Sequence, residues 1–150
     1  MKLPNLAFFV LPAVLFLASC ATGSFYIPQN LSPQELIQRA QEASDANRFG
    51  EALQYYNALL ERNPGNLSLV VNAEYEIGFI HERRRNFDEA RKWLNSVLAR
   101  YEQPGGESLP PKFRVLARIV LERIDEREIH LPGSENRADT DAENTGSGET

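Results

Sequence analysis

The residues that carry chemistry in most enzymes are few and scattered in this chain of 150 residues. It has one cysteine, Cys20, and two histidines, His81 and His130, so it offers neither a disulfide partner nor a metal-binding cluster of His and Cys. Carboxylates are numerous, but none stands beside a nucleophile in a hydrolase motif, and the sequence has no glycine-rich phosphate loop. The sequence therefore predicts a protein that is not an enzyme and that has no metal site and no cofactor.

The two histidines have structural interpretations. His81 follows Ile77 by four residues, so both belong to one face of a predicted helix, and we expect a core or edge histidine there. His130 closes the last predicted helix, where a partly positive ring complements the terminal carbonyl groups.

The segment before Cys20 resembles the leader of a bacterial lipoprotein. Lys2 precedes an apolar run over 6–18, which is shorter than the ~20 residues of a membrane-spanning helix. The run ends in Leu17-Ala18-Ser19-Cys20, which is similar to a lipobox. The resemblance implies that residues 1–19 are a signal peptide and that Cys20 carries acyl chains such as palmitate. The alternative is cleavage elsewhere, with Cys20 as an incidental thiol.

The same resemblance implies where the protein works. It predicts a bacterial cell-envelope protein that is attached to a membrane through lipid on Cys20. The residue after the cysteine is Ala21 and not aspartate, which favours the outer membrane in a diderm bacterium. Residues 20–31 form the expected tether, in which Phe25, Tyr26 and Ile27 either rest on the membrane or fold back onto the domain.

Helix signals divide the region 32–131 into five predicted helices. Capping boxes are expected at Ser32 with Glu35 and at Asn86 with Glu89, and proline and glycine separate the later segments. The helices are expected over about 33–46, 47–62, 67–84, 86–102 and 111–130. The rest of the chain, 132–150, has five carboxylates against one arginine and hardly any large apolar residue, so we expect a disordered acidic tail.

The pattern of the second predicted helix recurs in the fourth. Phe49 with Ala52 corresponds to Phe87 with Ala90, and Pro64 follows the first of these helices. Small residues also stand midway along the first, third and fifth helices, at Ala40, Gly78 and Ala117. These motifs resemble the tetratricopeptide repeat family, whose units of about 34 residues are helix pairs that stack into a superhelix.

The resemblance implies an all-α fold of antiparallel helix pairs, a short solenoid of about two and a half repeats with a C-terminal capping helix. Departures from the family pattern are Glu102 in place of proline, a spacing between the two copies that exceeds the family's repeat length, and Ala43 and His81 in place of larger apolar residues. The alternative is a generic five-helix bundle that uses the same alanines for close packing.

In the tetratricopeptide family the first helix of each pair lines a concave groove that binds a peptide. Carrying that face over assigns a protein-binding groove to Asn72, Tyr75, Phe79, Glu82, Arg114 and Arg118, with Gln34, Ile37 and Gln41 on the first helix. Tyr75 and Phe79 are one helical turn apart and form either an aromatic platform for a peptide or part of the core. Arg114 and Arg118 are positioned to receive acidic groups.

These interpretations together predict a lipid-anchored adaptor that binds another cell-envelope protein in an assembly, secretion or transport complex. A net charge of −5 disfavours nucleic acid as a partner. One alternative is a structural protein that self-associates as a homo-oligomer, since Val115 and Ile119 give the last helix a second apolar stripe. An enzyme is the third alternative.

Overall fold

The structure, a computed structural model, describes residues 25–129 and contains five α-helices in that range, with no strand. The helices are α1 (Pro33–Asp45), α2 (Phe49–Arg62), α3 (Leu67–Arg83), α4 (Phe87–Tyr101) and α5 (Pro111–Ile129), with a short 3-10 turn η1 (Gly106–Ser108) before α5. The predicted signal peptide, Cys20 and the acidic tail lie outside the described residues. None of the described helices is long and apolar enough to cross a membrane.

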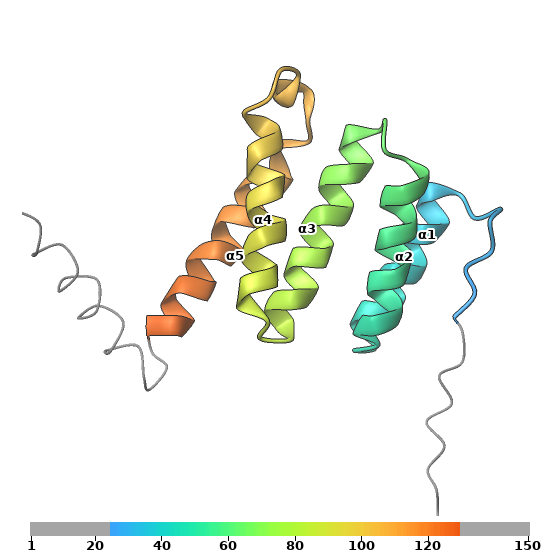
Figure 1. Ribbon diagram of the computed structural model, residues 1–150, viewed down its shortest axis with the longest axis horizontal. Helices are drawn as coiled ribbons and strands as arrows, with labels where there is room; N and C mark the ends of the chain where they lie inside the picture. Colours follow the sequence, from blue (N-terminus) through green and yellow to red (C-terminus); the bar gives the residue numbers. More distant parts are fainter. Residues whose placement is uncertain (1–24, 130–150) are drawn as a thin grey trace, which may run out of the picture.

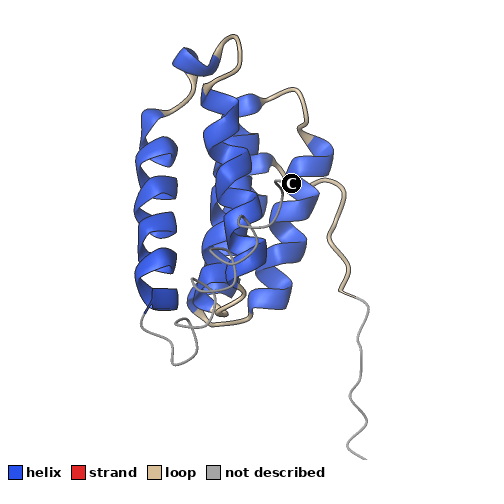
Figure 2. Ribbon diagram, turned by 60° about the vertical axis from the view of Figure 1, so that its left-hand side comes forward, coloured by secondary structure: helices blue, strands red, loops and turns tan. Residues whose placement is uncertain are grey.

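The helices pack as neighbouring antiparallel pairs, α1 with α2 and α3 with α4, and α5 lies against the second pair (Figure 1). Figure 2 shows the same helices running along one common direction, joined by short loops at the two ends. The expected all-α architecture with helices stacked in successive pairs is thereby confirmed.

The capping box predicted at the first helix is present. The Ser32 hydroxyl accepts a hydrogen bond from the backbone N–H of Glu35, and the Glu35 carboxylate accepts one from the backbone N–H of Ser32 at 2.8 Å. The second predicted box is wrong, because the Asn86 side chain makes no capping hydrogen bond to α4. Its amide nitrogen lies 3.4 Å from Nδ1 of His81 instead.

The turns inside the two helix pairs have the same backbone geometry. Asn47 and Arg85, which occupy corresponding positions of the two pairs, adopt left-handed conformations with φ of 58° and 60°. In each turn this residue and the next donate backbone hydrogen bonds to the last carbonyls of the preceding helix. The acceptors also correspond: they are Ser44 and Ala43 in the first turn, and Glu82 and His81 in the second. The sequence repeat is therefore also a repeat of local structure.

The small residues of the repeat lie at buried contacts between helices. The side chains of the four alanines at these positions are completely buried: Ala40, Ala52, Ala90 and Ala117. A Cβ added to Gly78 would lie 2.9 Å from Cγ of Leu94, so the Leu94 side chain of α4 fills the space beside Gly78 and would have to shift for a larger residue. The core forms two clusters, one centred on α1 and α2 and one between the second pair and α5.

Polar contacts of α3 tie neighbouring helices together. Glu74 of α3 is 5% exposed and accepts hydrogen bonds from Nε and Nη2 of Arg100 in α4, both at 2.6 Å. Arg83, at the other end of α3, donates to the Ser44 carbonyl and to Oδ1 of Asn47, and its guanidinium lies 4.8 Å from the Phe49 ring centroid. Arg83 thus connects the second pair to the turn of the first.

Candidate binding surface

Tyr75, one of the predicted groove residues, is part of the core. It is 8% exposed, its ring stacks on Phe79 with centroids 6.1 Å apart, and it packs at 5.7 Å against Phe113 of α5. Burial raises the pKa of the Tyr75 phenol above its ordinary value. Of the two interpretations left open by the sequence, core packing is the correct one for Tyr75, while Phe79 is only half-buried.

Glu82 is also enclosed and is not available to a partner. Its side chain is 2% exposed, and Oε1 accepts a hydrogen bond from Arg127 at 2.6 Å and lies 3.8 Å from Arg123. Both arginines belong to α5, so Glu82 joins α3 to α5. The assignment of Glu82 to an open groove was therefore wrong.

Arg114 and Arg118 do not line the same surface as Phe79. Arg114 donates to Glu102 at 3.0 Å, and its guanidinium lies 5.8 Å from the ring centroid of Tyr101, so it is directed to the C-terminal end of α4. Arg118, one turn later on the same flank of α5, is exposed. This corrects their assignment to the groove.

The error has a physical cause in the rotation of α5 about its axis. In the second pair, the face of α3 that bears the small residue Gly78 packs against α4, the second helix of the same pair, at Leu94. Helix α5 has no such partner among the described residues. It buries Ala117, with Phe113, Val120 and Ile124, against the preceding pair instead. Residues of α5 that were assigned to the groove by their position in the repeat therefore lie on a different side of the helix from the expected one.

Asn72, Glu76 and Phe79 are half-buried residues of α3, which we call the α3 strip. They are spaced by four and three residues, so they lie along one face of the helix. Burial raises the pKa of the Glu76 carboxyl; Lys112 of α5 opposes this shift and Asp45 of α1 adds to it. Glu76 therefore lies within electrostatic reach of both neighbouring first helices.

Glu76 is the functional candidate that the sequence reasoning missed. It follows Asn72 by one helical turn and precedes Phe79 by three residues, and that spacing alone places it between two residues already assigned to the binding face. The groove positions taken from the tetratricopeptide resemblance do not include Glu76. Helical periodicity applied to α3 would have found it.

A second surface feature lies where the chain enters the domain. Residues 25–31, which we call the strap, run along α2, and a shallow pocket of about 350 Å³ opens between them, lined on the α2 side by Gln54, Asn57 and Glu61 among others. Phe25 and Ile27 pack against the first core cluster, while Tyr26 is 75% exposed. Of the two positions considered for the strap aromatics, the fold-back position holds for Phe25.

The remaining polar candidates are modest. His81 is half-buried, and burial together with the nearby Arg84 lowers the pKa of its imidazole. In the described part of the chain, no group of three or more His, Cys, Asp or Glu side chains is arranged to hold a metal ion. A smaller pocket of about 220 Å³ lies between Tyr101, η1 and Arg114.

Comparison with known proteins identifies a relative in Treponema pallidum (strain Nichols), described as an uncharacterized protein. It is 35% identical over 118 residues, which is 77% of this chain and 47% of the relative. The chain thus spans about half the length of the curated relative that it matches. No family model matches the chain, and no solved structure matches it.

Proposed function

We propose that this chain is a lipid-anchored adaptor of the bacterial cell envelope, and that its helical domain is a short tetratricopeptide-like array that binds another envelope protein. The main support for a repeat array is that the second helix pair repeats the left-handed turn of the first pair with the same backbone hydrogen bonds. The order of Lys2, apolar run and lipobox before Cys20 supports the anchor. Ala21, in place of an aspartate, favours attachment to the outer membrane if the bacterium is diderm.

The α3 strip is the surface that we assign to the partner. Phe79 offers part of an aromatic face, and Asn72 offers an amide that both donates and accepts hydrogen bonds. Glu76, with Asp45 of α1 within its electrostatic reach, favours a basic side chain of the partner, which would compete with Lys112 of α5 for the Glu76 carboxylate. The occupant that best fits is an extended segment with a lysine or arginine close to an apolar residue.

Photo-crosslinking in cells tests this assignment on the full-length protein. A photoreactive residue at Asn72 should capture an envelope protein, and the same residue at Arg118, on the far flank of α5, should not. Phe79→Ala and Glu76→Gln should each weaken the capture from Asn72 severalfold. Capture that is equal from the two positions, or unchanged in both variants, would refute the α3 strip. Tyr75→Ala is unsuitable because Tyr75 belongs to the core.

The anchor has its own test. Mass spectrometry of the N-terminal peptide should show acyl chains on Cys20, and each buried methylene contributes ~0.8 kcal/mol to membrane attachment. Cys20→Ser should therefore release the protein from membranes into the aqueous phase of a detergent partition. A Cys20→Ser protein that stays with the membrane would contradict lipid anchoring at this residue.

Self-association through α5 is a second candidate function, favoured by three apolar side chains on its outer surface. Val115 is 57% exposed, Leu116 36% and Ile119 45%. If two copies of α5 pair antiparallel with the crossing point level with Ala117, Val115 lies opposite Ile119 of the second copy. The same register brings the exposed Lys112 opposite Glu122 of the second copy, and symmetry repeats both contacts.

Sedimentation velocity with charge reversal tests that register. Lys112→Glu should lower the dimer fraction because it places two carboxylates opposite each other. Adding Glu122→Lys to that variant should restore the fraction, since the pair is then only exchanged. A strict monomer at high concentration, or a dimer insensitive to Lys112→Glu, would remove this candidate.

A further inference from the structure

The strap is fixed to the first helix pair and is not a free linker. The Phe25 ring meets the Tyr55 ring edge to face, with centroids 5.0 Å apart and planes at 86°. Arg62, near the end of α2, donates hydrogen bonds to the carbonyls of Pro28 at 3.0 Å and Ile27 at 3.4 Å. Ile27 also packs against the first core cluster. The chain is therefore held against α2 from Phe25 onward.

This attachment limits how far the domain can stand from an acylated Cys20. Five residue steps separate Cys20 from Phe25, and a fully extended chain covers at most about 3.5 Å per step, so the reach is about 17 Å. The 19 residues of α5 are about 28 Å long at 1.5 Å per residue. The covalent link is thus shorter than one helix of the domain.

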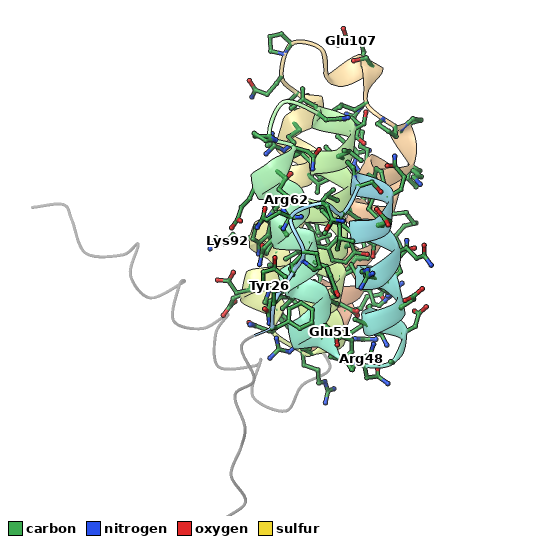
Figure 3. The ribbon with its side chains drawn as sticks, turned by 90° about the vertical axis from the view of Figure 1, so that its right-hand side faces the viewer. Tyr26, Arg48, Glu51, Arg62, Lys92 and Glu107 are labelled. Carbon is green, nitrogen blue, oxygen red and sulfur yellow. The ribbon has the colours of Figure 1, made fainter. Side chains whose placement is uncertain are left out.

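The strap enters at one side of the molecule. Figure 1 shows the strap, α1 and α2 at one end of the row of helices and α5 at the other. In Figure 3, Tyr26 lies toward the end that bears Arg48 and Glu51, and Glu107 lies at the opposite end. A short link at this place keeps α2 near the point of attachment and leaves α5 and η1 farther away.

We propose that the strap orients the domain on the membrane, with the strap side of α2 facing the lipid headgroups and α5 facing away. The inference rests on the proposed acylation of Cys20. Tyr26 supports a lipid surface as the occupant, because a 75% exposed tyrosine close to the anchor combines an apolar ring with a hydroxyl suited to the headgroup layer. The outer face of α5 remains open to the aqueous phase for a protein.

Fluorescence quenching on the acylated full-length protein tests the orientation. Cys20 is the single cysteine of the chain, so after acylation an introduced cysteine is the only thiol that a dye labels. One variant carries the dye at Gln54→Cys on α2 and the other at Glu122→Cys on α5, both exposed positions. In vesicles that contain a lipid with a nitroxide headgroup, quenching at position 54 should be severalfold stronger than at position 122.

Release of the strap provides the control. Phe25→Ala combined with Arg62→Ala removes the ring contact and both carbonyl hydrogen bonds, so the quenching difference should shrink strongly. Arg118→Ala removes an exposed arginine from α5 and should leave the difference unchanged. Because Phe25 also contacts the core, circular dichroism confirms that the released variant remains folded, and a flexible insertion between Ser24 and Phe25 gives a second way to lengthen the link.

The outcomes separate the orientation from the anchor. Acyl chains on Cys20 with equal quenching at the two positions would overturn the orientation and leave the anchor intact. An N-terminal peptide without acyl chains would overturn the anchor and with it this inference. Acylation with strong quenching at position 54, reduced by the insertion, is the result that we expect.

Discussion

Glu76 is half-buried on α3 between Lys112 of α5 and Asp45 of α1, and burial disfavours its ionised form. Its folded-state pKa is raised above the ordinary value of 4.5, so below pH 4.5 the carboxyl is neutral in both the folded and the unfolded chain. As the pH rises toward the folded-state pKa, Glu76 ionises first in the unfolded chain, so the free energy of unfolding falls. Above that pKa the loss is constant.

Glu76→Gln should therefore change stability in a pH-dependent way. The variant should gain little relative to wild type below pH 4.5 and gain progressively more as the pH rises, until the gain levels off above the folded-state pKa. Urea denaturation of both proteins across this range measures the difference. A difference in unfolding free energy that is the same at every pH would show that burial does not perturb this carboxyl.

Tyr56 offers a second residue-scale test. Its side chain is 1% exposed, and its hydroxyl has no hydrogen-bond partner among the described residues. Leaving such a group unpaired costs about 1 kcal/mol or more, so Tyr56→Phe should raise the unfolding free energy by about 1 kcal/mol. The matched control is Tyr101→Phe, which removes a hydrogen bond to the Pro110 carbonyl at 2.6 Å and should lower stability by about 1 kcal/mol. Equal effects of the two substitutions would contradict this account.

The sequence predicted most single-residue roles that depend on contacts within one helix pair. Ala40, Ala52 and Ala90 are buried as their repeat positions indicate, because those contacts follow from helical period and local pairing. The sequence left Tyr75 open between groove and core and assigned Glu82 wrongly to the groove, because the environment of both is set by α5, which comes later in the chain, beyond α4 and η1. No local pattern specifies which flank of α3 a later helix covers.

At the scale of elements, the two left-handed turns differ in how well their residues suit them. Asn47 and Arg85 have almost the same φ, but asparagine tolerates this region much better than arginine. The Asn47 side chain also accepts a hydrogen bond from Arg83 at 2.9 Å, whereas the Arg85 side chain is exposed. Arg85 is therefore a point of backbone strain that the first turn avoids.

Arg85→Gly should relieve that strain and raise the unfolding free energy by about 1 kcal/mol, because glycine adopts positive φ without a Cβ clash. Asn47→Gly, at the corresponding position of the first pair, should give no gain, since it removes a hydrogen bond and relieves less strain. Thermal denaturation of the two variants side by side measures this. A larger gain at position 47 than at position 85 would mean that backbone strain does not dominate at these turns.

Helix boundaries were predicted closely because capping and breaking residues act locally. Ser32 with Pro33 starts α1, and α2 ends before Asn63-Pro64-Gly65 as expected. The failed capping box at Asn86 has the same local origin. The backbone N–H of Asn86 already donates to the His81 carbonyl at 2.9 Å as part of the left-handed turn, so it is not free to donate to Glu89.

At the scale of the whole molecule, α5 determines how the core of the second helix pair is covered. The family pattern predicted a capping helix, and α5 does cover the second pair, burying Phe113, Ala117, Val120 and Ile124. Arg91 of α4 pairs with Asp125 and with Glu128, the latter at 2.8 Å. These contacts fix a rotation of α5 that repeat positions do not predict, because α5, which has no partner helix of its own among residues 25–129, turns its most apolar face to the core of the preceding pair.

The same Ile→Ala substitution at two positions of α5 tests this rotation. Ile124 is completely buried, so Ile124→Ala should lower the unfolding free energy by about 2 to 5 kcal/mol through lost burial and the cavity left behind. Ile119 is 45% exposed, so Ile119→Ala should change it by less than about 0.5 kcal/mol. Urea denaturation at low protein concentration avoids any contribution from self-association through α5.

The stabilities of Ile124→Ala and Ile119→Ala also distinguish the observed packing of α5 from the packing that the family pattern implies. If α5 were rotated as α3 is, residues of the Leu116 and Ile119 flank would face the preceding pair, as Ile77 and Ile80 of α3 do in the first core cluster. Ile119→Ala would then be as damaging as Ile124→Ala. We expect only Ile124→Ala to lower the unfolding free energy strongly, because the face of α5 that bears Ile124 closes the core of the second pair. With α5 packed in this way, the face that bears Ile119 remains exposed and available to another molecule.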